Sequence, residues 1–188
     1  MDLPAPLLLD LALDPGPTAA IPVLADASLW EAELRRWLET IRCTPELDCP
    51  VAVREAEDLS LGLQFCDDTT IAELNAAWRQ RQGPTDVLSF AALDDLPDDL
   101  IQPSLELGDI IISVDTARRQ AEEHGHTLLH ELRWLLSHGL LHLLGWDHPD
   151  EAALELMLRQ QERLLAVSHN IWTREPIPVV SPVNSDAH

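Results

Sequence analysis

The apolar positions along the chain follow two spacings, one typical of helices and one typical of strands. Over Ser28–Ile41 the apolar residues recur every three or four positions, which predicts an amphipathic helix. Polar and apolar residues alternate over Leu59–Cys66, as in a half-buried strand. A second helix is expected over Ile71–Arg79, with Asp68 or Thr69 as its N-cap.

Shorter apolar runs complete the predicted elements. Four of them are expected to be strands or extended segments: Pro6–Leu13, Val51–Val53, Val87–Phe90 and Leu107–Ser113. A helix over Thr116–Glu123 should end at Gly125, because glycine readily adopts the left-handed conformation found at helix ends. The chain contains no repeat of about 20 to 50 residues, which excludes a solenoid.

The segment Thr127–Leu144 predicts a long helix that carries the candidate chemistry. From Trp134 onward it is apolar on nearly every side except at Ser137, His138 and His142, so we expect it to be buried. The two histidines are four positions apart, which places both imidazoles on one face of the helix, one turn apart. They could therefore share a metal ion.

A third histidine follows in the loop after this helix. Gly145 stands where the helix can end and the chain can turn back, so that His148 approaches the two helical histidines from another direction. Three neutral imidazoles with a fourth position open to water are the ligand set of a catalytic zinc site. The sequence therefore predicts one zinc ion per chain, bound by His138, His142 and His148.

Other histidines lack such support. A histidine on an apolar helix is usually a hydrogen-bonded core residue, and His126 with His130 repeats the four-residue spacing without a further histidine downstream. We interpret this pair as structural. His124 and His169 are interpreted as surface residues.

The charge of the chain limits its possible partners. A formal net charge of −21 would repel phosphates over most of the surface, so non-specific adhesion to nucleic acid is excluded and no DNA partner is expected. All 12 basic residues are arginines, which excludes lysine Schiff-base chemistry and the lysine-containing phosphate loop. Arginine suits bidentate phosphate contacts, so an anionic partner must be bound locally.

The N-terminus and the cysteines indicate the compartment. Asp2 stands where a secretory signal would carry a basic residue, and no apolar run reaches the roughly 20 residues of a membrane helix. Cys43, Cys49 and Cys66 are odd in number and match no disulfide framework, so free thiols are expected. We expect a cytoplasmic protein without a membrane partner.

The histidine spacing also matches the metzincin proteases, H-E-x-x-H-x-x-G-x-x-H. Gly139 occupies the position of their glutamate, so a metalloprotease would lack a general base worth roughly 10²- to 10⁴-fold in rate. Asp147, beside the third histidine, is a candidate catalytic residue that could hold an imidazole or orient a water molecule. The alternative role for Asp147 is a turn or capping acid.

Together with the histidine segment, three further motifs resemble the bacterial YbeY endoribonucleases. The four segments, in the order of the family, are Leu74–Arg79, Pro84–Phe90, Leu107–Ile110 and His138–His148. The resemblance implies a single zincin-like α+β domain over residues 1–167, with a small mainly parallel or mixed sheet packed with helices and the His138–His142 pair on a buried central helix. Residues 168–188 are expected to form a flexible tail.

The resemblance also implies a function. Members of this family cleave single-stranded RNA with zinc, in ribosomal RNA maturation, particularly at the 3′ end of the small-subunit RNA, and in ribosome quality control. Carried over residue by residue, their zinc ligands fall on His138, His142 and His148, and an important arginine falls on Arg79.

Arg79 also has a role suggested by its position. At the end of a helix, its guanidinium could reach a scissile phosphate and stabilise the charge that develops there. The alternative is a surface arginine that interacts with the helix dipole. Arg79, Arg81 and Arg118 or Arg119 could together form a local positive groove, and a ribosomal or ribosome-associated protein could deliver the RNA. A metalloprotease and a non-catalytic zinc-binding ribosome-assembly module remain as alternative functions.

Overall fold

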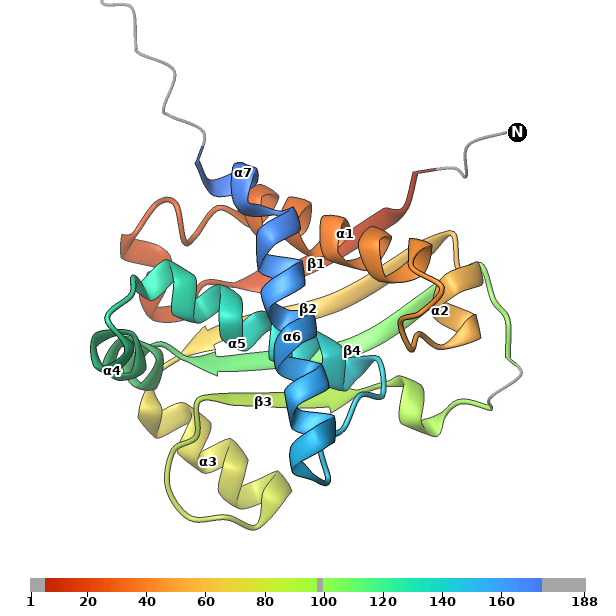
Figure 1. The fold of residues 1–188 in the computed structure, drawn as a ribbon. Helices are drawn as coiled ribbons and strands as arrows, with labels where there is room; N and C mark the ends of the chain where they lie inside the picture. Colours follow the sequence, from red (N-terminus) through yellow and green to blue (C-terminus); the bar gives the residue numbers. More distant parts are fainter. Residues whose placement is uncertain (1–5, 98–99, 174–188) are drawn as a thin grey trace, which may run out of the picture.

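A four-stranded sheet with strand order β1-β2-β4-β3 forms the centre of the molecule (Figure 1). The computed structural model describes residues 6–97 and 100–173. The strands are β1 (Leu8–Asp14), β2 (Asp58–Cys66), β3 (Val87–Ala91) and β4 (Ser104–Ser113). β1, β2 and β4 run parallel, and β3 is antiparallel to β4. The expected α+β class, with a small and mainly parallel sheet, is confirmed.

Seven α-helices pack around this sheet in the described part of the chain. They are α1 (Ala27–Cys43), α2 (Val51–Glu55), α3 (Asp68–Arg79), α4 (Val114–His124), α5 (Leu128–Leu143), α6 (Glu151–Val167) and α7 (His169–Trp172). α1, α5 and α6 lie on one side of the sheet, whereas α3 lies on the other (Figure 1). No helix among the described residues is long and apolar enough to cross a membrane.

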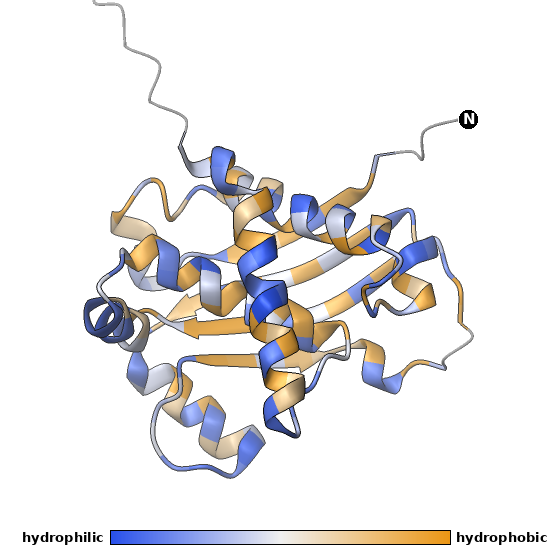
Figure 2. Cartoon of the chain, viewed as in Figure 1, coloured by the Kyte–Doolittle hydropathy of each residue, from blue (hydrophilic) through white to orange (hydrophobic). Residues whose placement is uncertain are grey.

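β4 separates two apolar clusters because its successive side chains point to opposite faces. Ile110 and Ile112 belong to the large core beneath α1, α5 and α6, whereas Ile111 packs with Ile71 of α3 and Leu88 of β3. Figure 2 shows the resulting apolar sheet, with hydrophilic residues on the outer faces of the helices. Burial on both faces explains the run of three isoleucines, Ile110–Ile112, near the end of this strand.

Side-chain caps determine where several helices begin. Asp67 caps α3 by accepting a hydrogen bond from the Thr70 backbone N–H at 2.7 Å, so the expectation of Asp68 or Thr69 as N-cap was wrong by one or two residues. Thr127 caps α5, as the sequence indicates. Gly125 ends α4 with φ of 71°, which confirms its predicted role at the helix end.

The segment Val51–Val53 is helical rather than extended, so that prediction was wrong. Pro50 precedes the helix, and the turn places Val53 in the core. It also directs the Arg54 guanidinium to the carbonyl oxygens of Arg42 and Leu47, at 2.7 and 2.6 Å. These tertiary contacts override the local preference of valine for strands.

Two C-terminal helices had no counterpart in the sequence prediction. α6 crosses α5, and α7 lies beyond the expected domain limit at residue 167. Trp172 of α7 packs against Trp30, with ring centroids 4.7 Å apart, and donates a hydrogen bond to Glu33 Oε2 at 2.7 Å. α7 is therefore part of the packed domain, and the rest of the expected tail, residues 174–188, lies outside the described residues.

Candidate metal centre

α5 holds His138 and His142 close to the sheet because Gly139, the residue after His138, is small. A Cβ atom at Gly139 would lie 2.8 Å from Ile110 Cγ2 on β4 and 3.1 Å from Ser89 Oγ on β3. The glycine thus allows a close approach of helix and strands. The same contacts leave no room for the glutamate that metzincins carry at this position.

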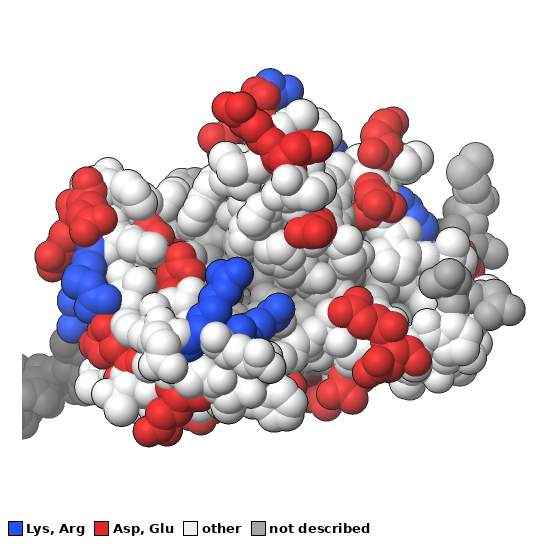
Figure 3. Space-filling view, turned by 90° about the horizontal axis from the view of Figure 1, so that it is seen from below, with Lys and Arg blue, Asp and Glu red and all other residues white. Residues whose placement is uncertain are grey.

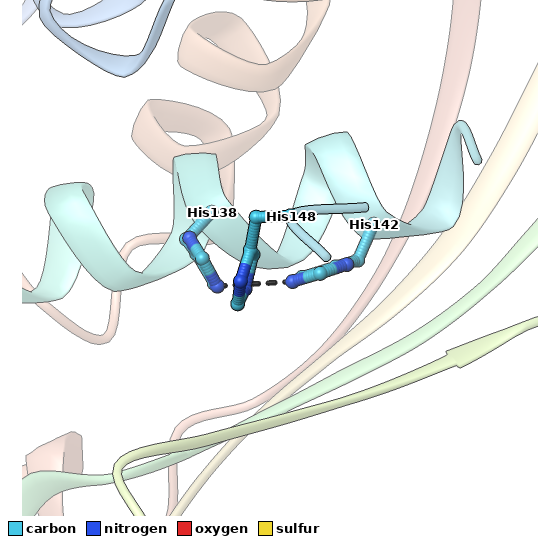
Figure 4. A group of neighbouring side chains, drawn as sticks. All are labelled: His138, His142 and His148. Carbon is cyan, nitrogen blue, oxygen red and sulfur yellow. Dashed lines mark hydrogen bonds between the residues drawn. The ribbon is translucent and has the colours of Figure 1, made fainter. Parts of the chain in front are cut away.

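The three histidines converge beneath α5 (Figure 4). The Nε2 atoms of His138 and His142 are 3.0 Å apart, and one ring nitrogen of each of the three residues lies within 4.8 Å of the others. His148 comes from the loop that follows the helix. Gly145, with φ of 91°, adopts the left-handed conformation that turns the chain back at this point.

Hydrogen bonds orient the two helical imidazoles. His138 Nδ1 lies 3.1 Å from Gln161 Oε1, and His142 Nδ1 lies 2.8 Å from the carbonyl oxygen of Trp146. The Gln161 amide is itself oriented, because its Nε2 donates to the Trp134 carbonyl oxygen at 3.1 Å. Since both partners of the imidazoles are acceptors, the protons reside on Nδ1 and the Nε2 lone pairs remain available for a metal.

Burial keeps these imidazoles neutral. It lowers the pKa of His138, although the hydrogen bond to Gln161 acts in the opposite direction. Burial, together with the neighbouring His138, also lowers the pKa of His142. Metal binding requires the neutral form, so both shifts favour it near pH 7.

The donor set fits zinc. Zn–N bonds of about 2.0 to 2.1 Å at tetrahedral angles place ligand nitrogens roughly 3.3 Å apart, close to the 3.0 Å between His138 and His142 Nε2. Imidazole also binds copper, nickel and iron, but three histidines with an open position are typical of catalytic zinc. The group can therefore hold a divalent transition-metal ion.

Arg79 contacts β3, the strand that borders the histidine helix. It is the last residue of α3, and its Nη2 donates to the carbonyl oxygen of Ser89 at 2.8 Å. Its guanidinium also lies 5.8 Å from the centre of the Phe90 ring. Because the Ser89 side chain faces Gly139, beside His138, this bond ties the end of α3 to the strand residue that α5 contacts.

The other arginines expected to form a positive groove do not share one environment. Arg81 is exposed just after α3, whereas Arg119 forms an ion pair with Asp68 Oδ2 at 2.9 Å. Figure 3 shows arginine side chains beside a hollow on one face, with acidic side chains around it. A groove that includes Arg118 or Arg119 receives no support from these contacts.

Asp147 stabilises the loop that carries the third histidine. Its Oδ1 accepts a hydrogen bond from the His148 backbone N–H at 2.8 Å, and its side chain is exposed. This contact corresponds to the turn-acid alternative. A role of Asp147 in catalysis stays a prediction.

Sequence reasoning missed the groups that orient the imidazoles. Gln161 is 23 residues from His138 and belongs to α6, for which no element had been predicted. The Trp146 carbonyl is a backbone atom, and no side-chain pattern identifies it. The only available signal was the position of Gly145, which implies a tight turn in this loop.

The chain is similar to known proteins of one family. Residues 26–169 match the family model described as Endoribonuclease YbeY. The chain is 61% identical to an Endoribonuclease YbeY of Synechococcus sp. (strain CC9605), over 84% of this chain and 97% of the relative. It is 53% identical to the Endoribonuclease YbeY of Parasynechococcus marenigrum (strain WH8102), over 96% and 99%.

The fold is also similar to a solved structure. The solution structure of TM1509 from Thermotoga maritima superposes with a TM-score of 0.50, covering 93% of this chain and 100% of that protein. The two sequences are 20% identical, so this likeness concerns the fold alone.

Proposed function

Because the chain belongs to the YbeY endoribonuclease family, we propose that it cleaves single-stranded RNA with one zinc ion bound by His138, His142 and His148. The observation that carries this proposal is the convergence of three imidazole nitrogens within 4.8 Å of one another. Neutral imidazoles and an open fourth position suit a hydrolytic rather than a structural ion.

The protein contributes positioning and charge stabilisation. Bound zinc would supply Lewis acidity, so that hydrolysis requires no strong protein base. Arg79 uses one N–H to hold the Ser89 carbonyl, which leaves further donors of its fixed fork for a phosphate oxygen. Since these donors are held before the substrate arrives, they can stabilise negative charge that develops on the phosphate.

An exposed aromatic side chain next to Arg79 suits an unpaired base. Trp78 is 69% exposed, and its ring lies edge-on to Phe90 with centroids 6.0 Å apart. Bases stack on such aromatic rings when they are not paired, whereas a duplex hides their faces. This arrangement supports a preference for single strands.

We further infer that the substrate is ribosomal RNA, cleaved at the 3′ end of the small-subunit RNA and in ribosome quality control. The family supports this inference, and the charge of the chain adds a condition. With a net charge of −21, general attraction to RNA is weak, so a ribosomal or ribosome-associated protein is expected to deliver the substrate.

The proposed substrate class can be tested with four substrates and zinc-loaded protein. Single-stranded RNA should be cleaved, whereas duplex RNA, DNA of the same sequence and casein should stay intact. A chelator should abolish RNA cleavage. Peptide cleavage that requires zinc would instead support the protease, and RNA binding without cleavage would support a non-catalytic assembly module.

A further inference from the structure

A second group of metal-binding side chains lies at the junction of α4 and α5, outside the histidine triad. His124 ends α4, His126 follows the turn at Gly125, and Glu131 lies in the first turn of α5. One donor atom of each of these three residues lies within 4.8 Å of the others. The sequence pattern had instead paired His126 with His130.

The carboxylate of Glu131 is the centre of this group. Its Oε2 forms a hydrogen bond with His126 Nε2 and lies 3.7 Å from His124 Nδ1. His130 does not join them through a ring nitrogen; its ring packs against that of His126, with centroids 4.4 Å apart. The structural interpretation of the His126 and His130 pair therefore left out His124 and Glu131, the other two members of this group.

The backbone fixes the group in place. Gly125 ends α4 in a left-handed conformation, and the His126 backbone N–H donates to the Ala121 carbonyl oxygen at 3.0 Å. The Thr127 hydroxyl then caps α5 by accepting from the His130 N–H at 3.1 Å. Two helix ends joined by a closed turn thus carry all three donor residues.

The surroundings of Glu131 favour a cation. Its side chain is only 3% exposed, and a buried carboxylate requires a positive partner. The guanidinium of Arg133 is engaged by Glu33, at 2.6 Å. Burial lowers the pKa of His130, so this neighbour is neutral near pH 7. Burial, and to a smaller extent the negative charge of Asp86, raises the pKa of Glu131 although His126 and His124 lower it, and a bound cation would offset the cost of this buried charge.

The group is open to solvent on one side. The side chain of His126 is 27% exposed and that of His124 is 59% exposed. An ion could therefore enter from water and meet the two imidazoles before it meets the buried carboxylate. Two histidines and one glutamate are also a known ligand set for zinc.

We propose that His124, His126 and Glu131 bind a second zinc ion, separate from the histidine triad. Zinc–nitrogen and zinc–oxygen bonds of about 2.0 to 2.2 Å place ligand atoms roughly 3.3 to 3.5 Å apart, near the 3.7 Å between His124 and Glu131. Binding replaces the direct hydrogen bond of His126 with Glu131 by two bonds to the ion. The ion links the end of α4 to the start of the helix that carries the triad.

Zinc stoichiometry and affinity, measured by competition with a chromophoric chelator on protein without a histidine tag, test this proposal. The wild-type chain should bind two zinc ions. His124→Ala should lose the second ion or weaken its binding more than tenfold, and a variant with His142→Ala and His148→Ala should keep it. His169→Ala replaces an exposed histidine of α7 and serves as the control, with two ions expected.

Thermal unfolding gives a second result that does not depend on RNA cleavage. Added zinc should raise the melting temperature of the His142→Ala, His148→Ala variant, because a ligand that binds only the folded state stabilises it. Adding His124→Ala to that variant should remove the increase. A single ion in the wild-type chain that His142→Ala and His148→Ala remove, or a second ion unaffected by both His124→Ala and Glu131→Gln, would overturn the proposal. A single ion that His124→Ala removes would instead contradict only the proposed function.

Discussion

Gln161 shows how a single residue outside the histidine motif can set the properties of the metal centre. Its side-chain oxygen faces His138 Nδ1, and its amide nitrogen is held by the Trp134 carbonyl oxygen. Partners of this kind fix the tautomer and the orientation of a metal-binding imidazole. We therefore propose that Gln161 is a positioning residue, which would act on a bound metal through His138.

Replacement of Gln161 should weaken metal binding without unfolding the protein. We expect Gln161→Leu to lower zinc affinity at the triad by about 10- to 100-fold, the usual effect of losing such a partner. Gln160→Leu is a matched control, since Gln160 is also buried and its Nε2 has no hydrogen-bond partner. Equal zinc affinities for the two variants, measured by chelator competition, would contradict the positioning role.

Arg79 allows a test of catalysis at one residue. Arg79→Ala should keep its fold and zinc content but lower single-turnover RNA cleavage by about 10²- to 10³-fold, as when one preorganised donor is removed. Arg79→Lys should recover only part of the rate, because an ammonium group lacks the fork geometry.

An arginine that only complements the helix dipole would behave differently. Lysine would replace it fully, and alanine would cost about 0.3 to 1 kcal/mol of stability without an effect on cleavage. Wild-type cleavage by Arg79→Ala, with thermal unfolding as the control, would therefore refute the catalytic role.

At the residue scale, the histidine spacing allowed the three histidines to be placed together in advance. Local geometry largely determines where these side chains point: His138 and His142 share one face of the helix, and Gly145 turns the chain so that His148 approaches them. The orienting partners and the His124, His126 and Glu131 group could not be predicted. They depend on how α6 crosses α5 and on how the α4–α5 turn closes, which are matters of tertiary packing.

The contact of α5 with the sheet depends on Gly139 as much as on the apolar face of the helix. In an isolated helix, alanine is favoured over glycine by about 1 kcal/mol. In this structure the added methyl group would meet Ile110 and Ser89. Overpacking of this kind costs about 1 to 3 kcal/mol.

Gly139→Ala should therefore destabilise the protein despite its better helix propensity. The expected result is a lower melting temperature and a lower midpoint of urea unfolding. Unchanged or increased stability would show that helix and strands are not in close contact at this position.

Asp68, the first residue of α3, links this helix to the end of β4 and to the start of α4. Its carboxylate accepts hydrogen bonds from Ser113 Oγ at 2.5 Å and Thr116 Oγ1 at 2.7 Å, besides its ion pair with Arg119. Burial alone would raise the pKa of Asp68, but these contacts outweigh it, so the pKa lies below its ordinary value of 3.8. The folded state thus binds this proton less tightly than the unfolded state does.

The sign of the pH effect follows from this shift. The contribution of Asp68 to the free energy of unfolding is complete above about pH 4 and is lost as the pH falls through the lowered pKa. Asp68→Asn should therefore lower the melting temperature at pH 7, and the difference from wild type should shrink in acid. Glu73→Gln removes an exposed carboxylate from the same helix and is the control. A difference that stays constant down to pH 2 would contradict this role.

At the element scale, periodicity predicted the helices and strands with strong patterns. Each of α1, α3 and α5 has an apolar face that is repeated over several turns, and β2 alternates along its length. The prediction of an extended segment at α2 was wrong because Val51–Val53 is too short to show a periodicity. The helical form of this segment depends on the contacts of Arg54. α6 was missed, although it supplies Gln161.

At the scale of the whole molecule, the overall charge is negative, whereas two arginines lie together at the end of α3. The chain carries a net charge of −21, yet Arg79 and Arg81 lie together at the end of α3. Long-range attraction of RNA is therefore weak, and the proposed function requires recognition through short-range contacts. This distribution disfavours indiscriminate cleavage and is consistent with delivery of the RNA by a protein partner.

The central claim is that the histidine triad is the catalytic metal centre. The most direct test is to remove the metal with a chelator and then add zinc back. Single-turnover cleavage of a single-stranded RNA should be absent after chelation and should return when zinc is added to the wild-type chain or to His169→Ala. It should not return in the folded variant with His142→Ala and His148→Ala at the same zinc concentration. Full cleavage by this variant, or by wild-type protein freed of metal, would contradict the assignment of the histidine triad as the catalytic metal centre.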